Sequence, residues 1–202
     1  MGRTAMKIVV GISGASGAIY GIRTLEVLKQ AGIETHLVIS DSAKRTLAYE
    51  TDYTIDAVKA LATRVHDIND VGAGIASGSF RHDGMIIAPC SIKTLSAVAN
   101  CFATNLMIRA ADVTLKERRK LVLMLRETPL HLGHLRLMAQ AAESGAVIAP
   151  PMPAFYHRPQ SIGDIVDQSV NRALDQFDLG ITLDLFPRWT GEEERSKARS
   201  AP

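Results

Sequence analysis

The chain has 202 residues, 47% hydrophobic and 22% charged, with 23 basic against 21 acidic side chains and a formal net charge of +2. This composition excludes a largely disordered chain, and the near-neutral balance excludes a general field for nucleic acid. Its two cysteines, Cys90 and Cys101, exclude a disulfide scaffold and favour a reducing compartment. No apolar run approaches the ~18–20 residues that span a bilayer. We therefore expect a cytoplasmic protein without a membrane span.

Short apolar, β-branched runs alternate with helical patterns along the chain, which predicts a parallel sheet covered by helices on both faces. The expected strands are 7–12, 34–40, 84–89, 120–125 and 146–150. The expected helices are 19–32, 42–50, 54–63, 91–99, 131–144 and 162–177. Residues 64–83 indicate an irregular excursion, and Ala110–Lys116 remains ambiguous. No repeat or linker divides the chain, so we predict one doubly wound domain over residues 7–189. Residues 1–6 form a short leader, and 190–202 a charged tail that we expect to be disordered.

Parallel sheets bind ligands at the carboxyl ends of their strands, so the segments that follow strands are candidate sites. Gly11–Gly17 follows the first strand and opens a helix, where backbone N–H groups and the helix dipole suit a phosphate. It has neither the third glycine of the dinucleotide motif nor the lysine of a P-loop. An anion site and a simple tight turn both remain open for it.

Pro89–Thr94 (PCSIKT) lies between a strand and a helix and offers backbone donors with a hydroxyl at Ser91 or Thr94. The alternative is a helix start at which Ser91 acts only as the N-cap and Lys93 is solvated. For Cys90, burial as a small hydrophobic side chain is favoured over a role as a nucleophile.

Arg126–Pro129 (RETP) directly follows the strongest late strand. Arginine binds phosphate in a bidentate manner, and the adjacent Glu127 can donate or accept a proton, although a surface ion pair explains the pair equally well. His131 and His134 lack an evident third ligand, which favours a structural role over a metal site.

Pro153–Pro159 (PAFYHRP) concentrates two aromatic rings, a histidine and an arginine in a chain with only 5% aromatic residues, and is a candidate substrate wall. Glu50, Tyr53 and Arg172 are weaker candidates, for which solvated surface is the plain alternative. The charge run Lys116–Lys120 indicates a solvated turn or a subunit contact.

Taken together, these segments resemble the UbiX-type flavin prenyltransferases, from about Lys7 to Trp189. The motifs that carry the resemblance are GASG at 14–17, ETD at 50–52, PCSIKT at 89–94, RAAD at 109–112, LKERR at 115–119, RETP at 126–129 and FYHRP at 155–159. So many motifs in the same order do not arise by chance.

The resemblance implies a Rossmann-like or flavodoxin-like three-layer α/β sandwich that uses FMN. The family joins the dimethylallyl group of dimethylallyl monophosphate to N5 and C6 of reduced FMN without a metal. The prenylated FMN would serve a UbiD-type decarboxylase, with ubiquinone biosynthesis as the expected pathway. Family members form homododecamers whose active sites are shared between subunits.

The resemblance also implies the site, residue by residue. The flavin would be held by Gly14, Ala15, Ser16, Ser40, Ser91, Ile92, Lys93, Thr94 and Arg126. The prenyl donor would be held by Arg109, Lys116, Tyr156, Arg172 and Trp189. Glu127 would be the catalytic acid or base, with Ser16 and Glu50 as a second proton relay. Cations suit the phosphate leaving group, and aromatic faces suit a developing allylic cation.

Two alternatives differ from this interpretation. The homologous flavin-dependent cysteine decarboxylases usually carry a PASANT-like segment and a Met-Asn-rich clamp, whereas this chain has PCSIKT and no such clamp. A non-catalytic FMN carrier would leave without a task Lys116, Arg126, Glu127, Tyr156 and Arg172.

Overall fold

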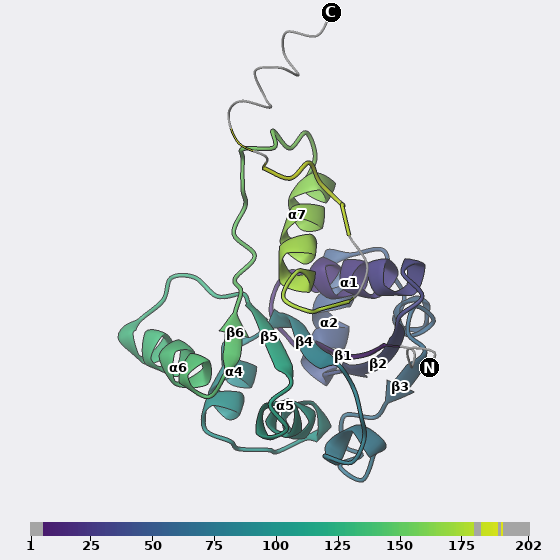
Figure 1. The fold of residues 1–202 in the computed structure, drawn as a ribbon, viewed down its shortest axis with the longest axis vertical. Coiled ribbons are helices and arrows are strands. Elements are labelled where there is room, and N and C mark those ends of the chain that lie inside the picture. The colour runs from purple at the N-terminus through teal and green to yellow at the C-terminus, as the bar shows by residue number, and fades with distance from the viewer. Residues whose placement is uncertain (1–5, 180–182, 190, 192–202) are drawn as a thin grey trace, which may run out of the picture.

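The computed structural model describes residues 6–179, 183–189 and 191. Within them, a parallel sheet has the strand order β3-β2-β1-β4-β5-β6 (Figure 1). The strands are β1 Lys7–Ile12, β2 Glu34–Ile39, β3 Arg64–His66, β4 Gly84–Cys90, β5 Lys120–Leu125 and β6 Ala146–Ile148. Every residue of β4 is buried, as the continuous apolar run of a central parallel strand requires.

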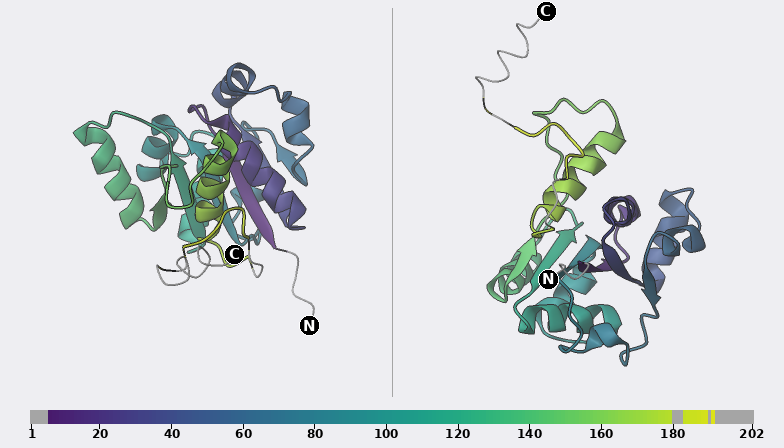
Figure 2. Two further views of the ribbon diagram at one scale, coloured as in Figure 1. Left: turned by 90° about the horizontal axis from the view of Figure 1, so that it is seen from above. Right: turned by 45° about the vertical axis from the view of Figure 1, so that its right-hand side comes forward.

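Helices cover both faces of the sheet and form two separate cores. The helices are α1 Ala18–Gln30, α2 Asp41–Glu50, α3 Ile55–Lys59, α4 Ile92–Ala99, α5 Leu106–Lys116, α6 Leu132–Glu143 and α7 Ile162–Leu174. Along β1, Ile8 and Val10 pack on the side of α1 and α7, whereas Val9 packs on the side of α4, α5 and α6. This alternation produces the three-layer sandwich seen in Figure 2 and confirms the expected fold.

Capping residues explain where several helices begin. The side chains of Ser40 and Ser91 accept hydrogen bonds from the backbone at the first turns of α2 and α4, and Ser161 forms a capping box with Asp164 at α7. Ser40 and Ser91 directly follow β2 and β4 respectively. Two capped helix starts therefore lie at the carboxyl edge of the sheet.

The structure corrects parts of the predicted element map. The excursion 64–83 contains the edge strand β3 and a 3₁₀ turn at Gly74–Ala76, and β3 is too short for periodicity to reveal. The ambiguous Ala110–Lys116 is the end of a longer helix, α5, which is capped by Asn105. Helix α3 is shorter than the expected 54–63. Most of the expected tail, 190 and 192–202, lies outside the described residues.

The loop 149–161, α7 and residues 183–189 extend beyond the sheet as one projecting unit (Figures 1 and 2). This unit exposes large apolar side chains: Met152 (72%), Phe155 (70%), Ile162 (80%) and Trp189 (52%). Apolar exposure on this scale is typical of a surface that another chain covers. Among the described residues, no helix has the length and apolar character needed to cross a membrane.

Candidate active site

The predicted flavin residues converge at the carboxyl ends of four strands. The strand order reverses between β1 and β4, and ligands of doubly wound sheets bind at such a switch point. Ser13, in the loop after β1, contacts the end of β4: its Oγ donates to the Pro89 carbonyl at 2.8 Å and accepts from the Ser91 N–H at 2.8 Å. The Arg126 N–H donates to the Cys90 carbonyl at 3.0 Å. The loops after β1, β4 and β5 are therefore tied to one another.

Gly14 lies where the loop after β1 passes the start of α2. A Cβ placed on Gly14 would lie 2.2 Å from the Oγ of Ser42. Ser42 Oγ is also 3.1 Å from the Oγ of Ser40, so three small residues meet here. Only glycine permits this approach of backbone to helix, because any larger residue would separate the loop from α2.

Glu50 occupies the N-terminus of α1 from the far end of α2. Its Oε2 accepts the N–H groups of Gly17 at 2.7 Å and Ala18 at 3.1 Å, and the Ser16 hydroxyl also donates to this carboxylate. Burial opposes ionisation of Glu50, but these hydrogen bonds and the charge of Arg126 outweigh it and lower its pKa. The anion at the start of α1 is therefore a side chain of the protein itself, whereas the starts of α2 and α4, which follow β2 and β4 at the same edge, carry no such carboxylate cap among the described residues.

Arg126 and Glu127 are both exposed just after β5. Burial raises the pKa of the Tyr20 phenol, and the charge of Arg126 partly offsets this effect. Arg126 therefore lies close enough to Tyr20 and Glu50 to influence both. Glu127 Oε1 accepts from the Thr128 N–H at 3.0 Å, which leaves its second carboxylate oxygen for another partner.

Arg109 and Lys116 lie on α5 and are apart from the flavin residues. Arg109 pairs with Asp112 at 2.7 Å and donates from Nε to the Ala76 carbonyl at 3.2 Å, whereas Lys116 pairs with Glu117. Lys116 ends α5 just before β5 begins, at the amino edge of the sheet. Within one chain, it lies at the opposite edge from the loops after β1 and β4.

Tyr156, Arg172 and Trp189 belong to the projecting unit. The rings of Tyr156 and Trp189 are 6.0 Å apart and nearly perpendicular. Arg172 lines a pocket of about 300 Å³ between β6 and α7, together with Gln168 and Gln176. Because α7 and α5 pack on opposite faces of the sheet, one chain does not bring Arg172 and Lys116 together.

Several other expected positions have structural roles. Ser91 is the N-cap of α4, the alternative stated for it beside a ligand-binding role, and Cys90 is buried, with a pKa raised to about 12 by burial. His131 caps α6 through Nδ1, and its ring lies 3.6 Å from that of His134. The described part of the chain contains no group of three or more His, Cys, Asp or Glu side chains arranged to hold a metal. Arg119, expected in a solvated turn, instead donates to two backbone carbonyls of the excursion 64–83.

Sequence reasoning missed Ser13, Ser42, Asp175 and Arg188. Ser13 lies inside the predicted anion-binding segment but is buried, with 2% exposure, and joins two loops. Asp175 lies three residues after Arg172, a spacing that favours an ion pair on a helix, so the sequence alone could have indicated this contact. Arg188 binds Asp175, which is 13 residues away in the sequence, and no local spacing predicts that contact.

A doubly wound sheet with hydroxyl groups, helix starts and an arginine at its switch point defines a Rossmann-like protein suited to a phosphate-bearing cofactor. The profile of the Flavoprotein family matches residues 2–174. The flavin prenyltransferase UbiX of Thauera aromatica is 76% identical over 195 residues, which are 96% of this chain and 100% of that relative. The chain therefore belongs to the UbiX flavin prenyltransferases.

Solved structures agree with this assignment. AnUbiX (PadA1), in complex with FMN and dimethylallyl pyrophosphate, has a TM-score of 0.91 and 51% identity, covering 94% of this chain and 100% of that one. A dodecameric FMN-dependent UbiX-like decarboxylase from Escherichia coli O157:H7 has a TM-score of 0.88 and 48% identity, covering 92% and 100%. The expectation of a flavin prenyltransferase is confirmed over the decarboxylase and carrier alternatives.

Proposed function

We propose that this flavin prenyltransferase holds FMN at the switch point between β1 and β4 and takes the dimethylallyl group from dimethylallyl monophosphate. The observation that carries the proposal is the convergence of Gly14, Ser16, Ser40, Ser91 and Arg126 on one edge of the sheet, where Gly14 has no room for a side chain. When bound in its reduced form, FMN supplies the N5 and C6 atoms that accept the prenyl group.

The residues at this edge fit FMN by their chemistry. Ser40, Ser91 and Thr94 supply hydroxyls beside the starts of α2 and α4, whose first N–H groups lack partners within the helix. Arg126 adds a positive charge suited to a phosphate. The remaining proposed flavin contacts are Ala15, Ser16, Ile92 and Lys93.

Glu50 and Ser16 form a proton path in this proposal. The hydrogen bonds that lower the pKa of Glu50 keep it a carboxylate near neutral pH, and the Ser16 hydroxyl donates to it. Ser16 can therefore pass a proton to Glu50 when a neighbouring group releases one. Glu127 is the proposed second acid or base, because its carboxylate follows Arg126 directly at the same edge.

The donor site requires more than one chain. Arg172, Tyr156 and Trp189 lie on the projecting unit, whereas Arg109 and Lys116 lie on the opposite face of the sheet. The exposed apolar side chains of the projecting unit also support burial against other copies. We therefore propose a homododecamer in which neighbouring chains complete each donor site.

Mixed oligomers test this sharing directly. Lys116→Ala and Arg172→Ala should each be nearly inactive alone. After co-assembly at equal amounts, about a quarter of the sites would combine an intact Lys116 with an intact Arg172 from different chains. Recovery of activity near that fraction supports a shared site, whereas no recovery places both residues in one chain.

The overall reaction is tested by anaerobic incubation with reduced FMN and dimethylallyl phosphate. The mass of the extracted flavin should increase by the prenyl group, and free phosphate should appear. An unchanged flavin mass without phosphate release would remove the proposed chemistry.

We also propose that the product serves a UbiD-type decarboxylase in the cytoplasm, with ubiquinone biosynthesis as the pathway, and that residues 7–189 act as one domain. The unpaired cysteines support a reducing compartment. Adding reaction product to a flavin-free decarboxylase of that type tests the transfer, because activity should return only when prenyl donor was included.

A further inference from the structure

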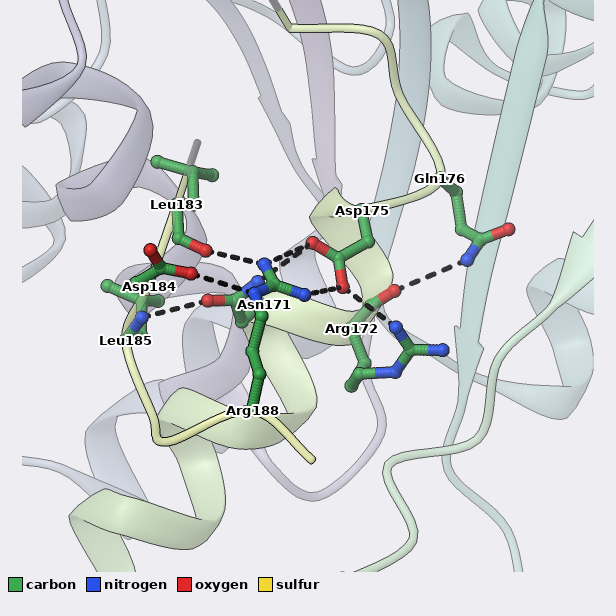
Figure 3. Close-up of polar contacts among 8 residues, drawn as sticks. All are labelled: Asn171, Arg172, Asp175, Gln176, Leu183, Asp184, Leu185 and Arg188. Atoms are coloured by element: carbon green, nitrogen blue, oxygen red, sulfur yellow. Dashed lines mark hydrogen bonds and ion pairs between the residues drawn. The ribbon is translucent and has the colours of Figure 1, made fainter. Parts of the chain in front are cut away.

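Asp175, the residue after α7, contacts both an arginine of the proposed donor site and an arginine of the following segment (Figure 3). Its Oδ2 accepts from Arg172 Nη1 at 2.8 Å and from Arg188 Nη1 at 2.9 Å. Its Oδ1 accepts from Arg188 Nη2 at 2.8 Å and from Asn171 Nδ2 at 2.9 Å. Both carboxylate oxygens are therefore fully used, and one of the two arginines is bound through two parallel hydrogen bonds.

Residues 183–189, which we call the strap, are fixed to α7 through these contacts. Arg188 also donates to Asp184 at 2.7 Å and to the Leu183 carbonyl, so its guanidinium closes the strap on itself. The Leu185 N–H donates to Oδ1 of the fully buried Asn171 at 2.9 Å. Because Trp189 directly follows Arg188, the Asp175 ion pair limits where that ring can lie.

Arg172 keeps most of its binding capacity while it is held. Only Nη1 donates to Asp175, and its side chain is 55% exposed at the pocket between β6 and α7. Its Nε and Nη2 have no partner among the described residues. These two nitrogens form the edge of the guanidinium that binds a phosphate in a bidentate manner.

We propose that Asp175 is a positioning residue of the prenyl-donor site, which holds Arg172 and the Trp189-bearing strap in one fixed arrangement. Arg172 would then meet the phosphate of the donor while Trp189, beside Tyr156, borders its allylic end. The inference rests on the proposed function, which places Arg172 and Trp189 at the donor. Such fixed spacing lowers the entropy cost of bringing both ends of the donor into place.

Asp175→Asn tests the proposal, with Asp178→Asn as the matched control. Asp178 is exposed and makes no hydrogen bond or ion pair with another described residue, and its replacement changes the net charge equally. Trp189 is the single tryptophan of the chain, so its fluorescence reports on the strap alone. In flavin-free protein, Asp175→Asn should increase quenching of Trp189 by acrylamide, whereas Asp178→Asn should not.

The kinetic readout separates positioning from simple stability. Asp175→Asn should raise the KM for dimethylallyl phosphate by about tenfold, the factor that one charge-assisted hydrogen bond supplies, with FMN affinity unchanged. Unchanged donor KM in a folded Asp175→Asn protein would overturn the proposal. An equal loss of FMN and donor affinity would also overturn it, because it would indicate general unfolding.

Arg188→Gln provides a second variant in case Asp175→Asn does not fold. It should free the strap but leave the Arg172–Asp175 contact, so Trp189 quenching should rise, and donor KM should rise by less than in Asp175→Asn. Unchanged quenching in this variant would overturn the role of the ion pair. Failure of the proposed function looks different: Arg172→Gln would then leave donor KM unchanged while the Trp189 response to Asp175→Asn remained.

Discussion

Gly14→Ala tests the proposed flavin site directly, because the structure gives the distance at which a new Cβ would meet Ser42. The new Cβ would lie 2.2 Å from Ser42 Oγ and 2.3 Å from Ser42 Cβ. Carbon contacts normally lie at ~3.5–4.0 Å, so the loop after β1 or the start of α2 must move by about 1 Å. Gly14 does not have a positive φ, so the expected effect is steric and does not come from backbone strain.

Overpacking of this kind costs about 1–3 kcal/mol, which corresponds to about 5- to 150-fold weaker FMN binding if the proposed flavin site bears the strain. Titration of the flavin-free protein with FMN, followed by flavin fluorescence, measures this change. The double variant Gly14→Ala/Ser42→Gly should restore most of the affinity, because it removes both of the closest atoms. Ser42→Gly alone is the control for the lost contact with Ser40.

Wild-type FMN affinity in Gly14→Ala would refute the steric reasoning. Additive losses in the double variant would show that Ser42 is not the obstacle. Compensation, in contrast, would show that the approach of the β1 loop to α2 is the feature on which flavin binding depends.

Three further predictions concern other residues. Glu50→Gln and Glu127→Gln should each retain FMN but slow prenyl transfer, as measured by flavin mass over time; wild-type turnover in either variant would remove that residue from the mechanism. Burial lowers the pKa of His82 to about 4, and its Nε2 has no partner among the described residues. Since the unfolded chain binds this proton near pH 6.5, stability should be complete above pH 6.5 and fall by up to about 3 kcal/mol as the pH drops towards 4. The free energy of unfolding, measured with urea at each pH across this range, should change less with pH in His82→Asn than in the wild type. An unchanged pH dependence would contradict the assignment. Cys90, whose pKa is raised to about 12 by burial, should resist alkylation at pH 8 in the native protein and react once it is unfolded.

Much of the fold could be predicted from the sequence because its signals are local. The runs 7–12 and 120–125 match β1 and β5, and Ser91 marks the start of α4 as its chemistry requires. β3 could not be predicted, since three residues with two exposed give no periodicity. The start of α5 depends on Asn105, whose cap lies outside the ambiguous segment.

The use of the α1 N-terminus could not be derived from local pattern. The segment Gly11–Gly17 indicates an anion site, and the structure places an anion there, but it is the carboxylate of Glu50, 33 residues from Gly17. No local rule pairs a helix start with the end of the next helix. Glu50 therefore places a carboxylate beside Ser16 at the start of α1, and our proposal assigns phosphate binding to the starts of α2 and α4.

The three cations proposed to bind the donor phosphate are each paired with an acidic side chain, which explains why the net charge of the chain does not reveal them. Arg109 pairs with Asp112, Arg172 with Asp175, and Lys116 with Glu117, so each cation has an acid within one helical turn. Each pair is nearly neutral from a distance, which fits a chain with a net charge of +2 that offers no general field for polyanions. The unused N–H groups of each cation still bind strongly at hydrogen-bonding range. A small phosphate that reaches several such cations at once, where neighbouring chains meet, is therefore favoured over a large polyanion that meets each pair singly.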